Sequence, residues 1–329
     1  SSIVIPNGAT SGSVQIPVHP DNPYIDAGTV TTTVTSATGG TENVVVDNTP
    51  VVTQVHDVPT PTVAHITAVD HVITENQVNA AVFNVHLDHA PQGAASVEVT
   101  IVDSHTGATT VQTVALDANG DAQVVYNSAH PDAYVDPSTV TATVTAVNGG
   151  NYERPVTGAS DVVQVTDITP PGPEVTTVHV TAATPEVNED LVNGAVFNIH
   201  LDNAPHGAAS VDVNIVDSRT GATIVQTVAL DANGDAQVVY NSADPDVYFD
   251  HTSVTATVTA VNGGGYEQTS VAGATATVSV VDTLTPVIAT ITAADHSITE
   301  NDVNAAVFNV HLDHAPQGAA SVEVTIVDS

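Results

Sequence analysis

Carboxylate side chains recur at regular places along this chain, and they are its residues best suited to chemistry. Residues 61–173 carry them in or beside predicted loops, as Glu75, Asp103, Asp132, Asp136 and Asp167. Carboxylate oxygens are the ligands that calcium prefers, and calcium accepts six to eight oxygens in flexible geometry. The residue types therefore indicate a site for a hard divalent cation.

The rest of the chain carries matching or complementary acids. They are Glu189, Asp217, Asp246, Asp250 and Asp282 in residues 174–285, Asp21, Asp26 and Asp57 near the start, and Glu300 and Asp328 near the end. The strands of an antiparallel sandwich alternate in direction, so its loops gather at two poles, and these acids are expected to share one pole. We expect calcium there. The alternative is a solvated acidic rim without a specific ion.

The charge balance favours a bound cation. The chain has 37 Asp and Glu residues against 2 Lys and Arg residues, and its net charge is −35. Converging carboxylates have hardly any cationic side chain to pair with, so a metal ion would relieve their repulsion. The same charge repels nucleic acid and anionic membranes, and no apolar run is long enough to span a bilayer. We expect neither nucleic-acid binding nor direct membrane insertion.

Other candidate sites have plainer interpretations. The sequence Asp117-Ala-Asn-Gly-Asp121 looks like the start of a calcium loop, but Asn-Gly also serves a hairpin turn and the distal Glu is missing. His86-Leu-Asp-His89 could hold zinc, yet the middle copy has Asn203 in place of the second histidine. Cysteine is absent, and no nucleophile motif, phosphate loop or paired acid–base cleft occurs. We expect a turn, surface histidines and no enzymatic activity.

Long internal repeats must position these residues. Residues 80–104 reappear letter for letter at 305–329, and a close variant occupies 194–218. The copies lie 114 and then 111 residues apart. A period of this length indicates whole domains in tandem rather than a solenoid of small units.

Each repeat is predicted to consist of short β-strands. Its segments alternate apolar and polar residues, are rich in Val and Thr, and are separated by turn residues, without a helical period. The pattern predicts an all-β chain of tandem, antiparallel, seven-stranded Ig-like β-sandwiches in an elongated array. In the first full repeat the expected strands are 62–69, 81–87, 96–103, 108–116, 122–127, 138–147 and 161–166.

Short linkers that contain proline divide the chain into four parts. We expect the C-terminal half of a repeat in residues 1–60, full repeats in 61–173 and 174–285, and the N-terminal half of a repeat in 286–329. Proline stiffens such linkers. The partners of each half are expected to be neighbouring repeats of a longer chain, or the complementary half of an identical chain. The second arrangement would build a head-to-tail filament by strand complementation.

Together these features resemble a known family. The repeats are acidic and free of cysteine, and they are joined through a linker such as Val281-Asp-Thr-Leu-Thr-Pro286. In this they are similar to the extender regions of bacterial RTX-type giant adhesins and biofilm-associated surface proteins. The resemblance implies an extracellular fibre, at the bacterial cell surface or in the biofilm matrix, with calcium stiffening its domain junctions. It also implies that Asp57, Asp167 and Asp282 are the linker aspartates.

A structural extender for cell adhesion is thus the leading hypothesis. The alternative is a multivalent binding module, whose loops at 88–95 and 148–157 would hold a surface glycan, another matrix fibre or a protein. In that case Tyr152 and Tyr266 are the residues expected to contact a sugar. The near identity of the copies favours a spacer, although multivalent binding also uses copies.

Overall fold

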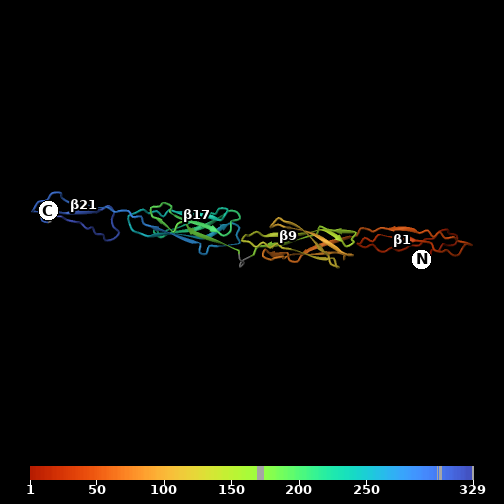
Figure 1. Ribbon diagram of the computed structural model, residues 1–329. Helices are drawn as coiled ribbons and strands as arrows, with labels where there is room; N and C mark the ends of the chain where they lie inside the picture. The colour runs from red at the N-terminus through yellow and green to blue at the C-terminus, as the bar shows by residue number, and fades with distance from the viewer. Residues whose placement is uncertain (169–173, 302, 304–305, 328–329) are drawn as a thin grey trace. The chain divides into compact units, whose positions relative to one another are not determined.

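The computed structural model describes residues 1–168, 174–301, 303 and 306–327 (Figure 1). Its contacts divide the chain into two units, which are Ser1–Pro131 with Asp136–Ile168, and Asp132–Val135 with Thr169–Ser329. Within the described residues the regular secondary structure consists of β-strands alone. No helix of the described residues is long and apolar enough to cross a membrane.

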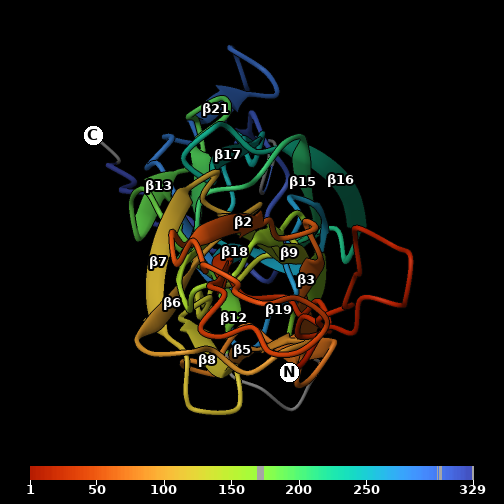
Figure 2. The ribbon, with the colours of Figure 1, turned by 90° about the vertical axis from the view of Figure 1, so that its right-hand side faces the viewer.

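Unit 1 contains a β-sandwich of nine strands. One sheet has the strand order β10-β3-β5-β8, and the other has the order β4-β11-β9-β6-β7. In Figure 2, β6 and β7 of the second sheet run next to each other, as their antiparallel pairing requires. The strands are β3 (Pro61–Ala68), β4 (Val72–Thr74), β5 (Ala81–Leu87), β6 (Ala95–Asp103), β7 (Thr109–Ala115), β8 (Asp121–Tyr126), β9 (Ser138–Gly149), β10 (Arg154–Val156) and β11 (Ser160–Thr166).

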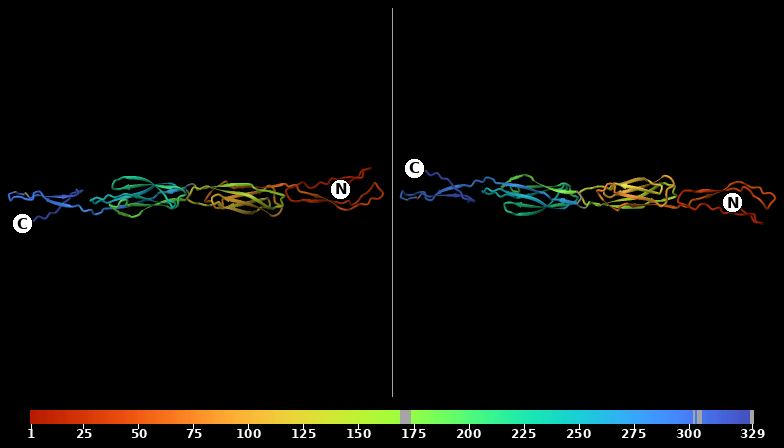
Figure 3. Two further views of the ribbon diagram at one scale, coloured as in Figure 1. Left: turned by 90° about the horizontal axis from the view of Figure 1, so that it is seen from above. Right: turned by 90° about the horizontal axis from the view of Figure 1, so that it is seen from below.

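Unit 2 contains a second sandwich with the same topology. Its sheets have the orders β17-β14-β12-β19 and β13-β20-β18-β15-β16, and they are drawn from green to light blue in Figure 3. The strands are β12 (Val175–Ala182), β13 (Glu186–Asn188), β14 (Ala195–Leu201), β15 (Ala209–Asp217), β16 (Thr223–Ala229), β17 (Asp235–Tyr240), β18 (Thr252–Gly263), β19 (Gln268–Ser270) and β20 (Thr275–Val281).

The predicted all-β sandwich is confirmed, but each sandwich has nine strands rather than seven. In unit 1 the additional strands are β4 and β10, which are three residues long and lie at sheet edges. Both pair in parallel, β4 with β11 and β10 with β3. Three residues are too few to show an alternating pattern, so the sequence gives no signal for them.

Alternate residues of the strands fill the space between the two sheets. Phe83 and Phe197 are the largest fully buried side chains, and Leu87 and Leu201 accompany them. Most of the remaining core consists of Val, Ile and Ala. A core of small side chains depends strongly on its few large ones.

The chain ends form strand pairs rather than sandwiches. In unit 1, β1 (Gly28–Thr32) pairs with β2 (Val51–Val55), and in unit 2, β21 (Ala289–Ala293) pairs with β22 (Phe308–Leu312). Phe308 is 55% exposed, and the neighbouring Val310 and Ile291 are exposed as well. These apolar faces are suited to covering by a complementary half-repeat.

Truncation of the buried phenylalanines tests the fold. We expect Phe83→Ala and Phe197→Ala each to lower the free energy of unfolding of their own sandwich by about 3–5 kcal/mol, because each leaves a cavity in a small core. Urea denaturation followed by circular dichroism measures the change. The matched control is Phe249→Ala, since Phe249 is 78% exposed and its truncation is expected to cost little. Equal losses for Phe83 and Phe249 would contradict the observed packing.

Candidate metal site

Three carboxylates of unit 1 meet at one end of the sandwich. Glu75, Asp136 and Asp167 each offer an oxygen, and these oxygens lie within 4.8 Å of one another. Glu75 follows β4, Asp136 precedes β9, and Asp167 follows β11. The structure thus brings together three of the five acids that the sequence places at this pole.

Backbone pairing explains this convergence. Strands β4 and β11 run parallel with Thr74 opposite Thr166, so the next residues, Glu75 and Asp167, leave the sheet side by side. The amide of Glu75 donates a hydrogen bond to the carbonyl of Thr166 (3.0 Å). The amide of Asp136 donates to Oδ1 of Asp167 (3.0 Å), which fixes the loop before β9 against the same point. The sheet edge and the loop therefore hold the carboxylates together.

A small cavity adjoins this cluster. Its volume is about 10 Å³, and Glu75, Ser128, His130, Asp136 and Asp167 are among its lining residues. Ser128 is 4% exposed, and its Oγ has no hydrogen-bond partner among the described residues. A space of this size holds one ion or one water molecule. A buried hydroxyl without a partner is costly, so an occupant that binds it would stabilise the site.

Unit 2 repeats the arrangement. Ligand oxygens of Glu189, Asp250 and Asp282 lie within 4.8 Å of one another. The amide of Asp250 donates to Oδ1 of Asp282 (3.0 Å), while Oδ2 of Asp282 is buried without a hydrogen-bond partner among the described residues. Ser242, the counterpart of Ser128, is also buried with an unpartnered Oγ. Both units therefore have a cluster of three carboxylates that includes one buried glutamate, together with a buried serine hydroxyl.

The carboxylates of the unit 2 cluster repel one another. Burial raises the pKa of Glu189 above its usual range, and the nearby charges of Asp282, Asp246 and Asp250 raise it further. The pKa of Asp250 is also raised, first by burial and then by Asp246 and Asp282. Glu189 is 3% exposed, so water screens its charge poorly. A bound cation would instead favour the ionised carboxylates and so lower the pKa values of Glu189 and Asp250.

The residues beside the clusters differ between the repeats. In unit 1 the rings of His105 and His130 lie 4.6 Å apart, and Nδ1 of His105 lies 3.5 Å from Oδ2 of Asp136. In unit 2 the corresponding residues, Arg219 and Asp244, form an ion pair. The sequence signals this difference at two positions, where His105 is replaced by Arg219 and His130 by Asp244.

Two further predicted ligands, Asp103 and Asp217, accept hydrogen bonds from neighbouring residues. Asp103 is buried, its Oδ2 accepts a hydrogen bond from Oη of Tyr126 (3.1 Å), and its Oδ1 accepts one from the amide of His105 (2.9 Å). Asp217 receives the same bond from Tyr240 (3.1 Å). Because these bonds hold the carboxylates against β8 and β17, neither aspartate joins the three-carboxylate cluster of its repeat.

Asp132 and Asp246 cap loop tips. Oδ1 of Asp132 accepts a hydrogen bond from the amide of Tyr134 (2.8 Å), and both residues belong to unit 2. Oδ1 of Asp246 accepts the amide of Tyr248 (2.6 Å). Asp246 nevertheless lies near enough to raise the pKa of Glu189, so it adds to the acidic end of that repeat.

The chain ends contain only parts of the cluster. Oδ2 of Asp57 accepts hydrogen bonds from the amides of Asp26 (3.2 Å) and Ala27 (3.0 Å), as Asp167 does from Asp136. Oδ1 of Asp21 accepts the amide of Val58 (3.2 Å). Near the other end, Glu300 is exposed, and Asp328 lies outside the described residues.

The Asp117–Asp121 segment forms a turn. Oδ1 of Asp117 accepts hydrogen bonds from the amides of Asn119 (2.8 Å) and Asp121 (2.9 Å). Gly120 has a φ of +85°, which a hairpin of this type requires. The aspartate is thus engaged in shaping the hairpin.

The two histidines of His86-Leu-Asp-His89 face different partners. Nδ1 of His86 lies 2.6 Å from Oδ1 of Asp121, whereas Nδ1 of His89 lies 3.4 Å from Oγ1 of Thr62. Their contacts give no convergent set of nitrogen ligands.

The tyrosines considered for glycan binding are held inside the loops after β9 and β18. Tyr152 is 5% exposed, and its Oη donates to the carbonyl of His89 (2.8 Å). Tyr266 is half-buried and makes the same bond to Asn203 (2.9 Å). Tyr152 therefore offers no open ring face to a sugar, because the packing that closes its loop also buries the ring.

Comparison with solved structures finds distant similarities. A tetra-tandem repeat in the extending region of a large adhesion protein shares 16% identity with a TM-score of 0.36, over 71% of this chain and 53% of that one. This chain therefore spans about half of that structure. CBD12 from CALX1.2 shares 11% identity with a TM-score of 0.24, over 66% of this chain and 99% of that one. Trypsin-activated alpha-2-macroglobulin from Escherichia coli shares 14% identity with a TM-score of 0.25, over 78% of this chain and 20% of that one.

Comparison with curated proteins finds no match. Among family models, that of the LapA domain matches residues 1–58 and 174–283, which together are about half of the chain. This match confirms the expected relation to the repeats of adhesins. The protein belongs to the LapA domain family.

Proposed function

We propose that this chain is a structural extender of a bacterial adhesin, at the cell surface or in the biofilm matrix, and that calcium stiffens its repeats. The observation that carries the proposal is the recurrence, in two sandwiches of one topology, of the same three-carboxylate cluster, each with a buried glutamate, at the same end. Membership of the LapA domain family supports the structural role. The neighbouring repeats would be the main partners of each repeat.

The chemistry of the ligand atoms favours calcium. In unit 2, Glu189, Asp250 and Asp282 supply carboxylate oxygens, and in unit 1 the buried hydroxyl of Ser128 lines the same cavity as the cluster. Calcium takes such hard oxygen ligands in variable geometry, whereas zinc prefers sulfur and imidazole, and magnesium retains several waters. Calcium would neutralise the carboxylates and join the segments that carry them.

The place of the cluster explains why calcium would stiffen the chain. Asp167 and Asp282 are the first residues after β11 and β20, where the chain leaves each sandwich. An ion shared with Glu75 and Asp136 would tie the start of the linker to the edge of the sheet and to the loop before β9. A linker that starts from a fixed point has fewer conformations available.

The exposed faces of the end strand pairs favour a second candidate function. Phe308 and its neighbours on β21 and β22 form an apolar surface that a complementary half-repeat of an identical chain would cover. This candidate predicts that sedimentation velocity gives a weight-average mass that rises with concentration. Phe308→Glu should then return the mass to that of a monomer, while Phe249→Glu should not.

Removal of calcium is expected to destabilise both sandwiches. At calcium concentrations about 100-fold above Kd, loss of binding lowers the free energy of unfolding by about 2.7 kcal/mol per site, so the Tm should fall by roughly 10 °C. Scanning calorimetry with calcium and with excess chelator measures the change, and small-angle scattering reports the accompanying flexibility.

Asp167→Ala should abolish the calcium-dependent part of the shift for unit 1 alone, because Asp167 belongs to the cluster of that unit. Asp121→Asn is the matched control, since Asp121 lies away from the cluster beside His86. An unchanged Tm and unchanged scattering dimensions in chelator would leave the acidic end as a solvated rim and reject the calcium proposal.

When calcium is removed by a chelator, the raised pKa values fix the direction in which the stability of unit 2 changes with pH. The folded-state pKa values of Glu189 and Asp250 are raised, so the folded protein binds protons more readily than the unfolded chain. Without calcium, the stability of unit 2 should therefore increase as the pH falls from about 7 to about 5. With calcium present the slope should reverse, because protons compete with the metal for the carboxylates.

Glu189→Gln isolates this effect from the general repulsion of a chain with a net charge of −35. The variant should flatten the pH dependence of the Tm in chelator, which thermal denaturation at each pH measures. Identical slopes for the variant and the unmodified chain would show that the buried carboxylate of Glu189 does not control the pH dependence.

A further inference from the structure

A tyrosine from residues 1–60 packs against the sandwich of unit 1. The rings of Tyr24 and Tyr152 are stacked, with centroids 5.8 Å apart and planes inclined by 27°. Oη of Tyr24 donates a hydrogen bond to the carbonyl of Ala90 (2.6 Å). The side chain therefore contacts both loops at this end of the sandwich, the one after β5 and the one after β9.

The backbone takes part in the same contact. Tyr24 and Tyr152 are partners in an isolated antiparallel bridge. The amide of Ile25 donates to the carbonyl of Asn151 (2.9 Å), and the amide of Glu153 donates to the carbonyl of Pro23 (3.0 Å). The turn around Tyr24, here called the tyrosine tip, is thus held in register by two strand-type hydrogen bonds. The ring of Tyr24 provides the aromatic contact.

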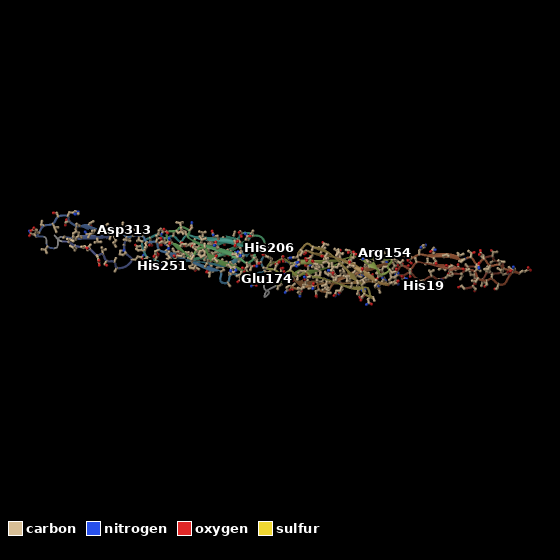
Figure 4. The ribbon with its side chains drawn as sticks, in the orientation of Figure 1. His19, Arg154, Glu174, His206, His251 and Asp313 are labelled. Atoms are coloured by element: carbon tan, nitrogen blue, oxygen red, sulfur yellow. The ribbon has the colours of Figure 1, made fainter. Side chains whose placement is uncertain are left out.

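Unit 2 contains the same contact with different residues. Tyr134 stacks on Tyr266 with centroids 5.8 Å apart and planes inclined by 26°, and its Oη donates to the carbonyl of Ala204 (2.6 Å). His206, labelled in Figure 4, stacks on the ring of Tyr134 as well, at 3.5 Å and 13°. Tyr134 therefore has a second aromatic contact, which Tyr24 lacks because Gln92 occupies the place of His206.

The backbone bonds of this second contact also match. The amide of Val135 donates to the carbonyl of Gly265 (2.8 Å), and the amide of Glu267 donates to the carbonyl of Ala133 (2.9 Å). Farther along unit 2, Oη of Tyr248 donates to the carbonyl of Ala315 (2.9 Å), in the segment that repeats the one around Ala90. Among the described residues the full contact thus occurs twice, and its hydroxyl–carbonyl bond occurs a third time.

The receiving loop is shaped by residues of its own repeat. Gly150 has a φ of +73°, and a Cβ added there would collide with the ring of Tyr152. Gly264 stands in the same relation to Tyr266. Oη of Tyr152 is bonded to the carbonyl of His89, so the ring is held in position independently of Tyr24. A site arranged in advance loses less entropy when it binds its ligand.

The tip is also prepared for docking. The amide of Tyr24 donates to Oδ1 of Asn22 (2.8 Å), and the amide of Tyr134 donates to Oδ1 of Asp132 (2.8 Å). These side-chain caps form a compact turn that places the tyrosine at its end. The turn that carries Tyr24 precedes β1, and the turn that carries Tyr134 precedes β9. In both cases the loops that receive the tyrosine belong to the next repeat in the sequence.

We propose that the loops around Ala90 and Tyr152, and around Ala204 and Tyr266, are docking sites for the tyrosine tip of the preceding repeat. The ligand class is an Asn/Asp-capped turn ending in tyrosine, supplied by another copy of the repeat. Docking uses ring stacking, two backbone hydrogen bonds and one hydroxyl–carbonyl bond, and none of these needs a charged group. The tyrosine contact is a calcium-independent lock between consecutive repeats.

Hydrogen exchange of the full chain, followed by mass spectrometry, tests the lock in unit 1. Tyr24→Ala removes the stacked ring and the bond to Ala90, so the amides of Ile25 and Glu153 should exchange at least tenfold faster. Tyr24→Phe keeps the ring and should give a smaller increase, roughly twofold to tenfold. Tyr126→Phe is the control, because its hydroxyl contacts Asp103 and not the lock.

Oxidative cross-linking provides a test without substitutions. Ruthenium-sensitised photo-oxidation of the unmodified chain should yield dityrosine peptides that join Tyr24 to Tyr152 and Tyr134 to Tyr266, because these ring pairs are already in contact. Tyr126 and Tyr240 stack on no other tyrosine among the described residues and should give little product.

Both experiments are performed with calcium and with excess chelator. Protection and cross-links that persist in chelator support the lock, even if calcium proves to have no effect on stability. Loss of both in chelator overturns its independence from calcium. The proposal is rejected altogether if Tyr24→Ala leaves the exchange of Ile25 and Glu153 unchanged and neither dityrosine forms in either condition.

Discussion

Repulsion between a buried glutamate and the two aspartates beside it is the constraint on which the ends of these sandwiches depend. Glu189 is almost fully buried beside Asp250 and Asp282, in a chain that has two cationic side chains of the Lys and Arg type. Burying like charges together is unfavourable unless protons or a cation neutralise them. The parallel pairing of β13 with β20 places Glu189 beside Asp282, so the fold itself creates the repulsion. The calcium that we propose would neutralise these charges and link a sheet edge to a linker.

Alternation of Val and Thr made the fold predictable. In β9 and β18 the buried positions fall on every second residue, and a one-residue shift would turn the whole core face to solvent. The short strands β4 and β10 escaped prediction because their pairing comes from tertiary contact rather than from a local pattern. Yet β4 is the strand that delivers Glu75 to the cluster. The element most important for the site thus carried the weakest sequence signal.

The location of the candidate site could be predicted from the sequence, but the set of residues that form it could not. Strand direction places the loops at one pole, which located Glu75, Asp136 and Asp167 correctly. It does not tell which acids are already engaged, and Asp103 is held by Tyr126 from the neighbouring β8. Ser128 gave no signal either, since an isolated serine in a loop is ordinary until its hydroxyl is found buried and unpartnered. Membership depends on side-chain contacts, and one sequence does not encode these in a local pattern.

The carboxylate clusters and the tyrosine contacts depend on different physical interactions. The surface charge of the chain makes most encounters between repeats repulsive, so attraction requires places where charge is neutralised or absent. Under the calcium proposal the carboxylate clusters are of the first kind, and their strength would depend on calcium and pH. The tyrosine tips are of the second kind, because Tyr24 and Tyr134 dock through rings and backbone groups. Asp136 lies two residues from Tyr134 in one loop, so a single short segment carries both contacts. Loss of calcium would therefore weaken that loop while its tyrosine remained docked.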